Sequence, residues 1–480
     1  LATVRGADLE GVRTRHPWLD RESPIVLGEH VTLEAGTGLV HTAPGHGQED
    51  YEVGLRYGLD VYAPVDGRGR FVPSVAEFGG MKVFEADAKI IEHLEGQGRL
   101  LHAVPLQHPY PHCWRCHKAI IFRATEQWFI SMEAKDLRGR ALAAIEQVRW
   151  IPSWGRDRIA GMVGARPDWC ISRQRAWGVP IVALHCEKCG TTSTNETLLA
   201  HVAALFAVES SDAWFARPVA DFVPPGFACP ECGGTTFTKE EDILDVWFDS
   251  GVSFAAVVER RPELGGHPDL YLEGSDQHRG WFQSALLTSV GTRGSAPYQS
   301  VLTHGFVLDE DARKMSKSVG NVVAPQQIVA SRGADILRLW VAAEDYRDDV
   351  RISREILDRA SEAYRRIRNT ARFLLGNLAD FDPAHELVPP AQLLELDRFI
   401  LDRLQGLIER CRRAYDAFEF HVVYHALNNF CSVDLSALYL DIVKDRLYCE
   451  GASSLERRSG QTALYHLLEG LVRLDRKSVV

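Results

Sequence analysis

The sequence predicts a multidomain α/β protein, because its character changes twice along the chain. Residues 1–108 are rich in Gly and in short apolar runs, which is typical of a compact β-rich domain of short strands. Residues 109–345 alternate strand-like runs with amphipathic segments, and this alternation favours a parallel sheet covered by helices. Residues 346–480 carry long amphipathic segments, so we expect an α-helical bundle after the α/β part.

Two C-x-x-C pairs mark an inserted module at about residues 181–242. Cys186 pairs with Cys189 and Cys229 with Cys232, and 39 residues lie between the pairs. Four thiolates in this arrangement suit a tetrahedral metal ion, so we predict a structural Zn²⁺ site in this module.

A third C-x-x-C pair, Cys113 and Cys116, has no free second pair to complete a site. His112 and His117 flank it, but ligands adjacent to a cysteine in sequence rarely fit the same tetrahedron. Metal binding by this pair is therefore left open.

Hydrophobic spacing defines the first two helices of the expected bundle. In the first helix, one face carries Ile356, Leu357, Ala360, Tyr364, Ile367, Ala371 and Leu374. In the second, the corresponding face carries Phe399, Ile400, Leu404, Leu407, Ile408 and Cys411. Between them, Pro383 and the pair Pro389 and Pro390 indicate a loop.

Composition is that of an ordinary globular protein, with 45% apolar and 25% charged residues. No apolar run is long enough to span a bilayer, and the N-terminal segment does not resemble a secretory signal, so we expect a cytoplasmic protein. A net charge of −11 excludes a uniformly basic nucleic-acid-binding protein but not a local basic patch. Because the first residue is not Met, we expect the chain to be part of a longer polypeptide.

A lysine-serine pentapeptide is the most informative short motif. It follows the strand-like run SVLTHGFVL and consists of Lys314, Met315, Ser316, Lys317 and Ser318. Taken alone, such a segment is also typical of a solvated loop. Two ammonium groups beside the edge of a sheet would, however, stabilise the negative charge that develops on a polyphosphate leaving group.

Three further segments give the pentapeptide a family context. They are residues 166–180 (RPDWCISRQR followed by WGVP), 245–251 (DVWFDSG) and 273–282 (EGSDQHRGWF). With the pentapeptide, they resemble, in the same order, the signature blocks of class I aminoacyl-tRNA synthetases. Residues 41–51 (HTAPGHGQEDY) resemble the editing domain of the isoleucyl branch, so the chain is identified as similar to bacterial-type isoleucyl-tRNA synthetases.

This resemblance implies a fold and an activity. We expect the second half of a class I Rossmann-type catalytic domain at 109–345, a partial editing domain before it and an incomplete anticodon-binding bundle after it. The complete, monomeric enzyme would activate isoleucine with ATP and Mg²⁺, transfer it to tRNA(Ile) and hydrolyse mischarged valine. The alternatives are a valyl-tRNA synthetase or a non-catalytic, zinc-stabilised RNA-binding derivative of a synthetase. Because the first-half signature His-x-Gly-His is not in the sequence, the chain alone is expected to be inactive.

The resemblance also assigns residues to sites. The aminoacyl-adenylate would be bound by Glu273, Gly274, Asp276 and Gln277, with Trp247 and Trp281 as walls of the isoleucine pocket. Lys314 and Lys317 would stabilise the departing pyrophosphate, and the whole pentapeptide would bind ATP. These residues should border one cleft at the carboxyl ends of parallel strands.

A second site is expected in the first domain, separate from the synthetic one. Asp50 would hold the α-ammonium group of the wrong amino acid in the editing pocket, which His41 would line. The alternative for Asp50 is an aspartate that caps a loop.

Overall fold

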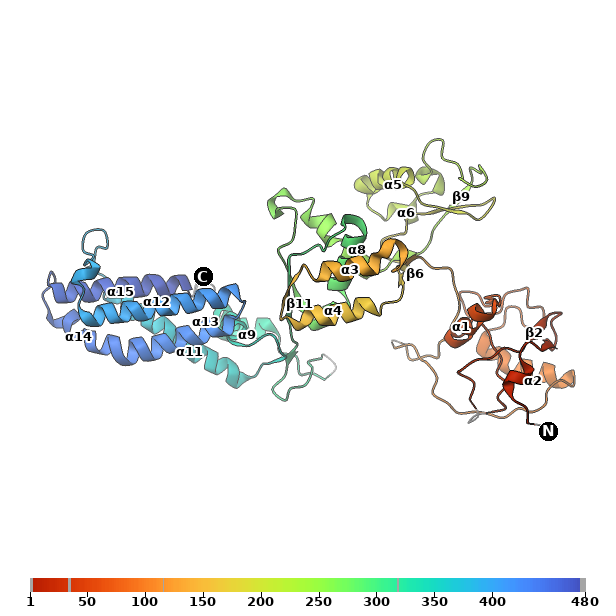
Figure 1. Ribbon diagram of the computed structural model, residues 1–480, viewed down its shortest axis with the longest axis horizontal. Helices are drawn as coiled ribbons and strands as arrows, with labels where there is room; N and C mark the ends of the chain where they lie inside the picture. The colour runs from red at the N-terminus through yellow and green to blue at the C-terminus, as the bar shows by residue number, and fades with distance from the viewer. Residues whose placement is uncertain (1–2, 33–35, 115, 317–318, 475–480) are drawn as a thin grey trace. The chain divides into compact units, whose positions relative to one another are not determined.

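The computed structural model describes residues 3–32, 36–114, 116–316 and 319–474. The chain forms two compact units, Leu1–Gln127 and Trp128–Val480 (Figure 1). The α/β part and the helical part both belong to the second unit. The domain boundaries expected at residues 108 and 345 stay predictions.

The first unit holds few strands among its described residues. Its elements are η1 (Gly6–Leu9), β1 (Arg13–Arg15), β2 (Glu22–Pro24), α1 (Gln48–Tyr57) and α2 (Val83–Gly96). β1 and β2 pair antiparallel, but each has three residues, so the β-rich character expected for residues 1–108 is wrong for the described part. The apolar runs there are interrupted by Gly and Pro, which end a strand ladder, whereas residues 83–96 carry apolar side chains at helical spacing.

A three-stranded parallel sheet lies in the α/β part of the second unit. Its strands are β4 (Arg149–Ile151), β11 (Leu270–Gly274) and β12 (Ser300–His304), in the order β11-β12-β4. The buried side chains of α3 (Leu137–Ile145), α4 (Trp154–Gly164) and α8 (Trp281–Arg293) join those of the sheet in one cluster. α8 is buried continuously from Phe282 to Val290, as expected for a helix inside this core. The predicted parallel α/β layer is confirmed.

Short elements connect this core to its surroundings. They are β3 (Phe129–Ile130), η2 (Ala134–Asp136), β5 (Trp169–Cys170), β6 (Ser172–Arg173), β10 (Ile243–Leu244), α7 (Val246–Gly251), η4 (Phe254–Val258), η5 (Pro262–Leu264), η6 (Ser275–His278), β13 (Val307–Leu308), α9 (Pro325–Arg332), α10 (Ala334–Ala343) and β14 (Val350–Arg351). β13 and β14 pair in parallel, and β3 with β5 and β6 with β10 pair antiparallel.

The cysteine module consists of residues 181–242 and has buried side chains of its own. It contains β7 (Leu184–Cys186), β8 (Thr192–Ser193), α5 (Glu196–Glu209), α6 (Ala213–Ala216), η3 (Val219–Phe222) and β9 (Phe237–Lys239). The strands form a small antiparallel sheet in the order β8-β7-β9. Trp214 and Phe222 are fully buried between the sheet and the helices and pack on each other.

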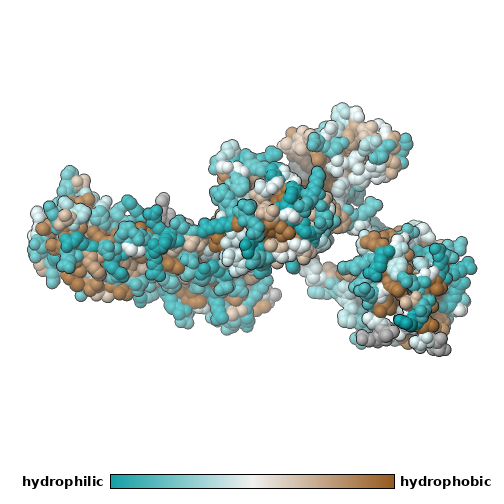
Figure 2. Space-filling model, viewed as in Figure 1, coloured by the Kyte–Doolittle hydropathy of each residue, from teal (hydrophilic) through white to brown (hydrophobic). Residues whose placement is uncertain are grey.

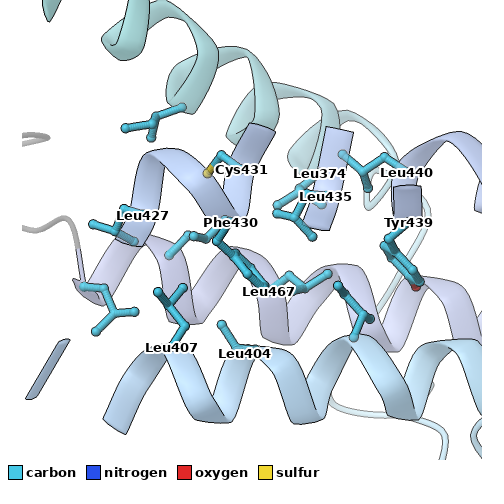
Figure 3. Close-up of a cluster of buried hydrophobic side chains, with 14 of the residues drawn as sticks. Leu374, Leu404, Leu407, Leu427, Phe430, Cys431, Leu435, Tyr439, Leu440 and Leu467 are labelled. Atoms are coloured by element: carbon cyan, nitrogen blue, oxygen red, sulfur yellow. The ribbon is translucent and has the colours of Figure 1, made fainter. Parts of the chain in front are cut away.

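The helical bundle occupies the end of the described chain. Its elements are α11 (Arg354–Gly376), η7 (Pro390–Gln392), α12 (Glu395–Asp416), α13 (Phe420–Asn429), η8 (Phe430–Tyr439), α14 (Leu440–Cys449) and α15 (Leu455–Leu474). A continuous apolar core runs between these helices (Figure 3), and Leu404, Leu435 and Leu467 are at most 5% exposed within it. The two helices predicted from hydrophobic spacing are confirmed as α11 and α12.

Phe399 is an exception to the predicted core face of α12. Its side chain is 46% exposed, while the adjacent Ile400 is fully buried. The buried stripe of α12 runs through Ile400, Leu404 and Leu407, so Phe399 lies beside the stripe, one helical position (about 100°) away. Sequence spacing alone could not separate these two adjacent apolar residues.

A buried polar cluster fixes the start of α12. Asp397 is completely buried and accepts hydrogen bonds from the Tyr439 hydroxyl (2.7 Å), the Ser459 hydroxyl (2.5 Å) and both terminal nitrogens of Arg446 (2.8 and 3.0 Å). These partners come from η8, α14 and α15. One carboxylate therefore ties together three segments that follow α12 in the sequence.

The surface of the bundle is mixed in character. The face seen in Figure 2 is largely hydrophilic, with apolar side chains in several places. Exposed apolar residues of these helices include Phe399, Val433 and Ile442. Among the residues that the structure describes, no helix combines the length and the apolar character needed to cross a membrane.

Candidate functional site

The carboxyl end of β11 presents an exposed carboxylate. Glu273 and Gly274 are the last residues of this strand, and Gly274 pairs with His304 at the end of the parallel strand β12. The Glu273 side chain is 52% exposed, and its Oε1 atom lies 3.7 Å from His304 Nε2. Ligands of open α/β sheets bind at this edge, so the sequence-predicted Glu273 occupies a position suited to ligand binding.

A tight turn follows Glu273 and gathers several of the predicted residues. Gln277 accepts a hydrogen bond from the backbone N–H of Trp281 (2.9 Å) and donates one to Asp276 (3.3 Å). A Cβ atom at Gly280 would lie 2.6 Å from Gln277 Oε1 and 2.8 Å from the Trp247 ring. Glycine is therefore required at position 280 for the indole of Trp247 to pack against the turn.

The two tryptophans predicted for the amino-acid pocket differ in how they are held. Trp281 stacks on Tyr271, with ring centroids 4.0 Å apart, and its Nε1–H lies within hydrogen-bond distance of the Ser250 carbonyl (3.0 Å) and the Ser253 hydroxyl (3.1 Å). Trp247 packs against Gly280 but stays 42% exposed. Trp281 is thus fixed on one face, whereas Trp247 keeps an apolar surface open.

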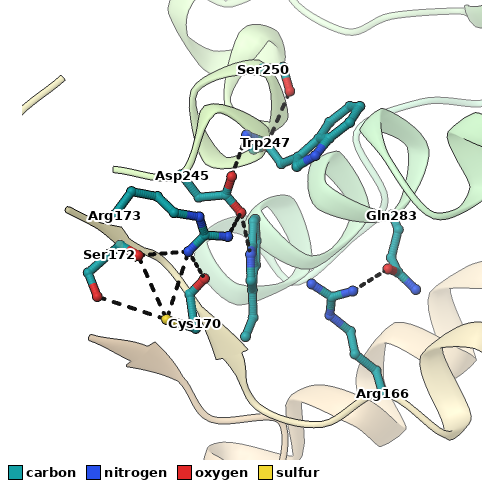
Figure 4. A network of polar contacts seen from close by, with 9 residues as sticks. Arg166, Cys170, Ser172, Arg173, Asp245, Trp247, Ser250 and Gln283 are labelled. Carbon is teal, nitrogen blue, oxygen red and sulfur yellow. Dashed lines mark hydrogen bonds and ion pairs between the residues drawn. The ribbon is translucent and has the colours of Figure 1, made fainter. Parts of the chain in front are cut away.

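Asp245 positions Trp247, although the sequence motifs gave no prediction of a role for it. This buried carboxylate accepts hydrogen bonds from the Trp169 indole (3.1 Å), from Arg173 (2.9 Å) and from the backbone N–H of Trp247 (3.2 Å), which it caps at the start of α7 (Figure 4). An aspartate directly before a helix is a recognisable N-cap signal, and this signal could have found it. The Arg173 and Trp169 partners depend on tertiary structure.

The described part of the pentapeptide, Lys314 to Ser316, lies outside the named helices and strands, and we call the described residues 309–316 and 319–321 the lysine loop. The backbone of Lys314 forms an antiparallel β-bridge with that of Leu308 in β13, and the Lys314 Nζ atom lies 5.7 Å from the centre of the Phe306 ring. The Met315 sulfur accepts a hydrogen bond from the backbone N–H of Val323 (3.4 Å). Two further predicted residues, Lys317 and Ser318, lie outside the described residues.

The lysine loop begins a few residues after β12, the strand that contacts Glu273, with the short strand β13 between them. β12 ends at His304, beside Glu273, and Phe306 under Lys314 is two residues farther along the chain. A pocket next to the loop has lining residues that include Asp309, Asn321 and Ile328, but not Glu273, Trp247 or Trp281. A single cleft shared by all the predicted residues therefore stays a prediction.

The four cysteines of the module converge on one point. Their sulfur atoms all lie within 4.8 Å of one another, with Cys186 and Cys232 3.5 Å apart and Cys189 and Cys229 3.6 Å apart. Tetrahedral zinc with zinc–sulfur bonds of about 2.3 Å requires sulfur–sulfur distances of roughly 3.8 Å, so this donor set fits the ion.

Backbone turns aim these sulfurs inward. Gly190 and Gly233, which follow the two pairs, have φ of 74° and 67° and donate their N–H groups to the carbonyls of Cys186 (2.8 Å) and Cys229 (2.9 Å). Positive φ values favour glycine, which explains its presence after each pair. Among the described residues, these cysteines are the only group of three or more potential metal ligands, and it does not include Cys113 or Cys116.

The predicted editing aspartate lies in the first turn of α1. Its Oδ2 atom accepts a hydrogen bond from the backbone N–H of Ala43 (3.1 Å), and its Oδ1 atom lies 4.0 Å from His30 Nε2. The Asp50 side chain is 22% exposed, and His41 is exposed. The contact with Ala43 is the kind expected of a loop-capping aspartate, so both interpretations of Asp50 stay open.

Family models match two parts of the chain. Residues 21–353 match a model described as tRNA synthetases class I (I, L, M and V). Residues 397–474 match the anticodon-binding domain of tRNA ligase. The second match falls on α12 to α15 of the helical bundle.

Curated relatives match nearly the whole chain. Over 474 residues it is 60% identical to the isoleucine–tRNA ligases of Geobacter sulfurreducens and Syntrophotalea carbinolica, and 59% identical to that of Moorella thermoacetica. These alignments cover 99% of this chain and 51% of each relative. The chain thus spans about half the length of the curated relatives it matches, and its predicted resemblance to isoleucyl-tRNA synthetases is confirmed.

Solved structures share the fold. The chain is similar to Mycobacterium tuberculosis methionyl-tRNA synthetase bound by methionyl-adenylate, with a TM-score of 0.51 and 18% identity over 76% of this chain and 63% of that one. At this level of identity, the similarity shows the fold alone. With the family matches, it confirms the predicted class I catalytic fold followed by an anticodon-binding domain.

Proposed function

This chain belongs to the class I tRNA synthetases of the I, L, M and V group, and on that basis we propose that it is part of an isoleucine–tRNA ligase. The complete enzyme would activate isoleucine with ATP, transfer it to tRNA(Ile) and hydrolyse mischarged valine. It would act in the cytoplasm as a monomer. The catalytic part would extend over residues 109–345, with the partial editing domain before it and the anticodon-binding bundle after it.

The strongest structural support is the arrangement after β11. An exposed carboxylate, Glu273, stands at the carboxyl end of a parallel strand, close to a turn against which Trp247 packs with part of its ring open. A carboxylate binds an ammonium group or a ribose hydroxyl, and an indole covers a branched aliphatic side chain. We therefore assign the aminoacyl-adenylate to Glu273, Gly274, Asp276, Gln277, Trp247 and Trp281.

The lysine loop would serve the nucleotide. Lys314 and Lys317 would stabilise the negative charge on the departing pyrophosphate, together with Mg²⁺ on the phosphates. Met315, Ser316 and Ser318 would complete the ATP-binding loop. The place of Lys314 above Phe306, just after the strand that contacts Glu273, supports this assignment.

The remaining sites have separate roles. Cys186, Cys189, Cys229 and Cys232 would hold a structural zinc ion, which fits the positions of the four sulfur atoms. Asp50 and His41 would belong to the editing pocket. The bundle would bind tRNA(Ile): the match of residues 397–474 to an anticodon-binding model supports a tRNA as its partner, and the isoleucine–tRNA ligase relatives support the choice of tRNA(Ile).

Pyrophosphate exchange in the complete enzyme that contains this chain tests the proposal. Isoleucine should drive exchange better than valine by ~10- to 200-fold, the range that one methylene supplies in an apolar pocket and for which isoleucyl enzymes are the standard example. Better exchange with valine would establish the valyl alternative, and no exchange with either would favour the RNA-binding alternative. The 480-residue chain alone, which lacks His-x-Gly-His, should give no exchange.

A charge-removing variant connects the activity to β11. Glu273→Gln should lower kcat/KM for isoleucine by roughly 10- to 100-fold, because a hydrogen bond to a charged group contributes about 1.5–3 kcal/mol. Glu263→Gln, at an exposed position in η5, is the matched control and should behave like the wild type. Equal kinetics for Glu273→Gln and the wild type would remove Glu273 from the site.

A further inference from the structure

A buried carboxylate stands at one end of the lysine loop. Asp309 is 6% exposed, although it belongs to a surface loop. Its Oδ1 atom accepts hydrogen bonds from the backbone N–H groups of Asp311 (3.1 Å) and Arg313 (2.8 Å). Its Oδ2 atom accepts hydrogen bonds from the Arg313 side chain (3.2 Å) and from Asn321 Nδ2 (2.8 Å). A buried carboxylate is stable only with such partners.

The amide of Asn321 stands at the other end of the same loop and bonds to three points of it. Its Nδ2 group donates to Asp309 and also lies 3.3 Å from the carbonyl oxygen of Lys314. Its Oδ1 atom accepts a hydrogen bond from the backbone N–H of Ser316 (2.9 Å). Donor and acceptor of one side chain are thus both used inside the loop.

These bonds determine where Lys314 lies. The bridge to Leu308 and the bond from Asn321 hold its backbone on both sides. Leu308 is itself fixed, because its carbonyl accepts a hydrogen bond from the N–H of Ile352 (3.1 Å) next to β14. The ammonium group above Phe306 therefore extends from an anchored backbone rather than from a free loop.

We propose that Asp309 and Asn321 are positioning residues that form a latch: through their contacts with each other and with the backbone of Lys314 and Ser316, they hold Lys314 above Phe306, just after β12, for the activation step. The inference rests on the proposed function. Stabilisation of a developing charge depends on groups that are placed before the reaction begins, and a displacement of about 1 Å can cost 10²-fold in rate. The latch supplies this placement, while Lys314 supplies the charge.

Reciprocal substitutions in the complete enzyme test the latch. Asn321→Asp places two carboxylates against each other, and Asp309→Asn places two amide donors against each other, so each should lower kcat of isoleucine-dependent pyrophosphate exchange by roughly 10- to 100-fold. KM for isoleucine should change by less than about twofold, since the amino-acid pocket is untouched. In the double variant Asp309→Asn/Asn321→Asp, an amide again faces a carboxylate, and about 10-fold of the loss should be recovered.

Two further measurements separate positioning from a general loss of structure. Transfer of isoleucine from preformed adenylate to tRNA should proceed at the wild-type rate in all three variants, because pyrophosphate has already left. Asn377→Asp is the matched control: its amide donates to the Phe373 carbonyl (2.9 Å) at the end of α11, so kcat of exchange should not change.

The outcomes are distinct. A wild-type enzyme without isoleucine-dependent exchange would refute the proposed function itself. With an active wild type, single variants that exchange at the wild-type rate would refute the latch. A double variant no faster than the slower single variant would refute the pairing of Asp309 with Asn321. Equal losses in exchange and transfer would also overturn the proposal, because they indicate a structural role.

Discussion

The cysteine module and the helical bundle reach a stable core by different means. The module buries a small cluster around Trp214 and Phe222, and two of the residues buried in that cluster, Cys186 and Cys229, belong to the four-cysteine centre. The bundle buries a long cluster of leucines that extends through its helices. Small domains bury too little apolar surface to be stable alone, so the zinc ion proposed for the four cysteines would take over part of the role of a core. The difference can be tested by substitutions of decreasing effect.

Loss of the metal should have the largest effect and should be confined to the module. Cys229→Ser removes one thiolate, and structural zinc contributes on the order of 10–16 kcal/mol in small zinc domains. Hydrogen exchange should show loss of protection in residues 184–239 and native protection in residues 395–474, with zinc content falling to zero. Cys411→Ser, at a fully buried cysteine of the bundle, should retain the zinc. Native hydrogen-exchange protection of the module in the absence of zinc would contradict the proposal that the module needs a metal for its stability.

The buried carboxylate of the bundle should give the next largest effect. Asp397→Ala leaves Arg446, whose side chain is 17% exposed, without its partner, and breaking such a pair costs about 3–5 kcal/mol. Denaturant unfolding of the complete enzyme, monitored by hydrogen exchange in the bundle, measures the loss of unfolding free energy. Asp441→Ala breaks only the exposed pair with Lys444 and should cost about 0.5 kcal/mol or less. Equal losses for the two variants would mean that burial of Asp397 is unimportant.

Removal of core volume should follow. Leu435→Ala, at a fully buried position of η8, should destabilise the bundle by about 3 kcal/mol through lost burial and a residual cavity. Leu198→Ala, equally buried in the module, should instead appear as weaker zinc binding, since folding of the module would be coupled to binding of the proposed zinc ion. Zinc affinity measured by chelator competition distinguishes the two. Unchanged zinc affinity in Leu198→Ala would show that zinc binding does not depend on the apolar core of the module.

The smallest effect is expected at Phe399. Its side chain is 46% exposed, so Phe399→Ala should change the unfolding free energy of the bundle by about 0.5 kcal/mol or less. Ile400→Ala, one residue away and fully buried, should cost about 3 kcal/mol. Equal losses at Phe399 and Ile400 would show that both side chains belong to the core, as the sequence predicted.

Sequence patterns predicted the features that repeat at short range. Helical spacing found α11 and α12, and C-x-x-C spacing found cysteines whose sulfurs converge. The contacts that fix the helical bundle and the lysine loop could not be found this way. Asp397 and Arg446 are 49 residues apart, and Asp309 and Asn321 are 12 apart, so neither pair produces a periodic signal.

In the first unit, too, the sequence pattern could not predict the long-range contacts. Its Gly-rich runs suggested strands, but the partner of each strand cannot be read from composition. In the described part of residues 1–108, which were expected to be β-rich, β1 and β2 pair over only three residues. Asp50, in the same region, lies on a helix. The sequence motif placed Trp281 in the amino-acid pocket but could not predict its stacking on Tyr271, because that contact depends on how α8 lies against β11.

The strand order of the central sheet has a consequence for the chain as it leaves the ribosome. β4 is made first and β11 second, but among the described strands each pairs with β12, which is made last and lies between them. Arg149 therefore has no strand partner until Ser300 has emerged. The cysteine module, encoded between them and with a core of its own, can form in the meantime. Translation that stops before residue 300 would thus leave the cysteine module without the parallel sheet.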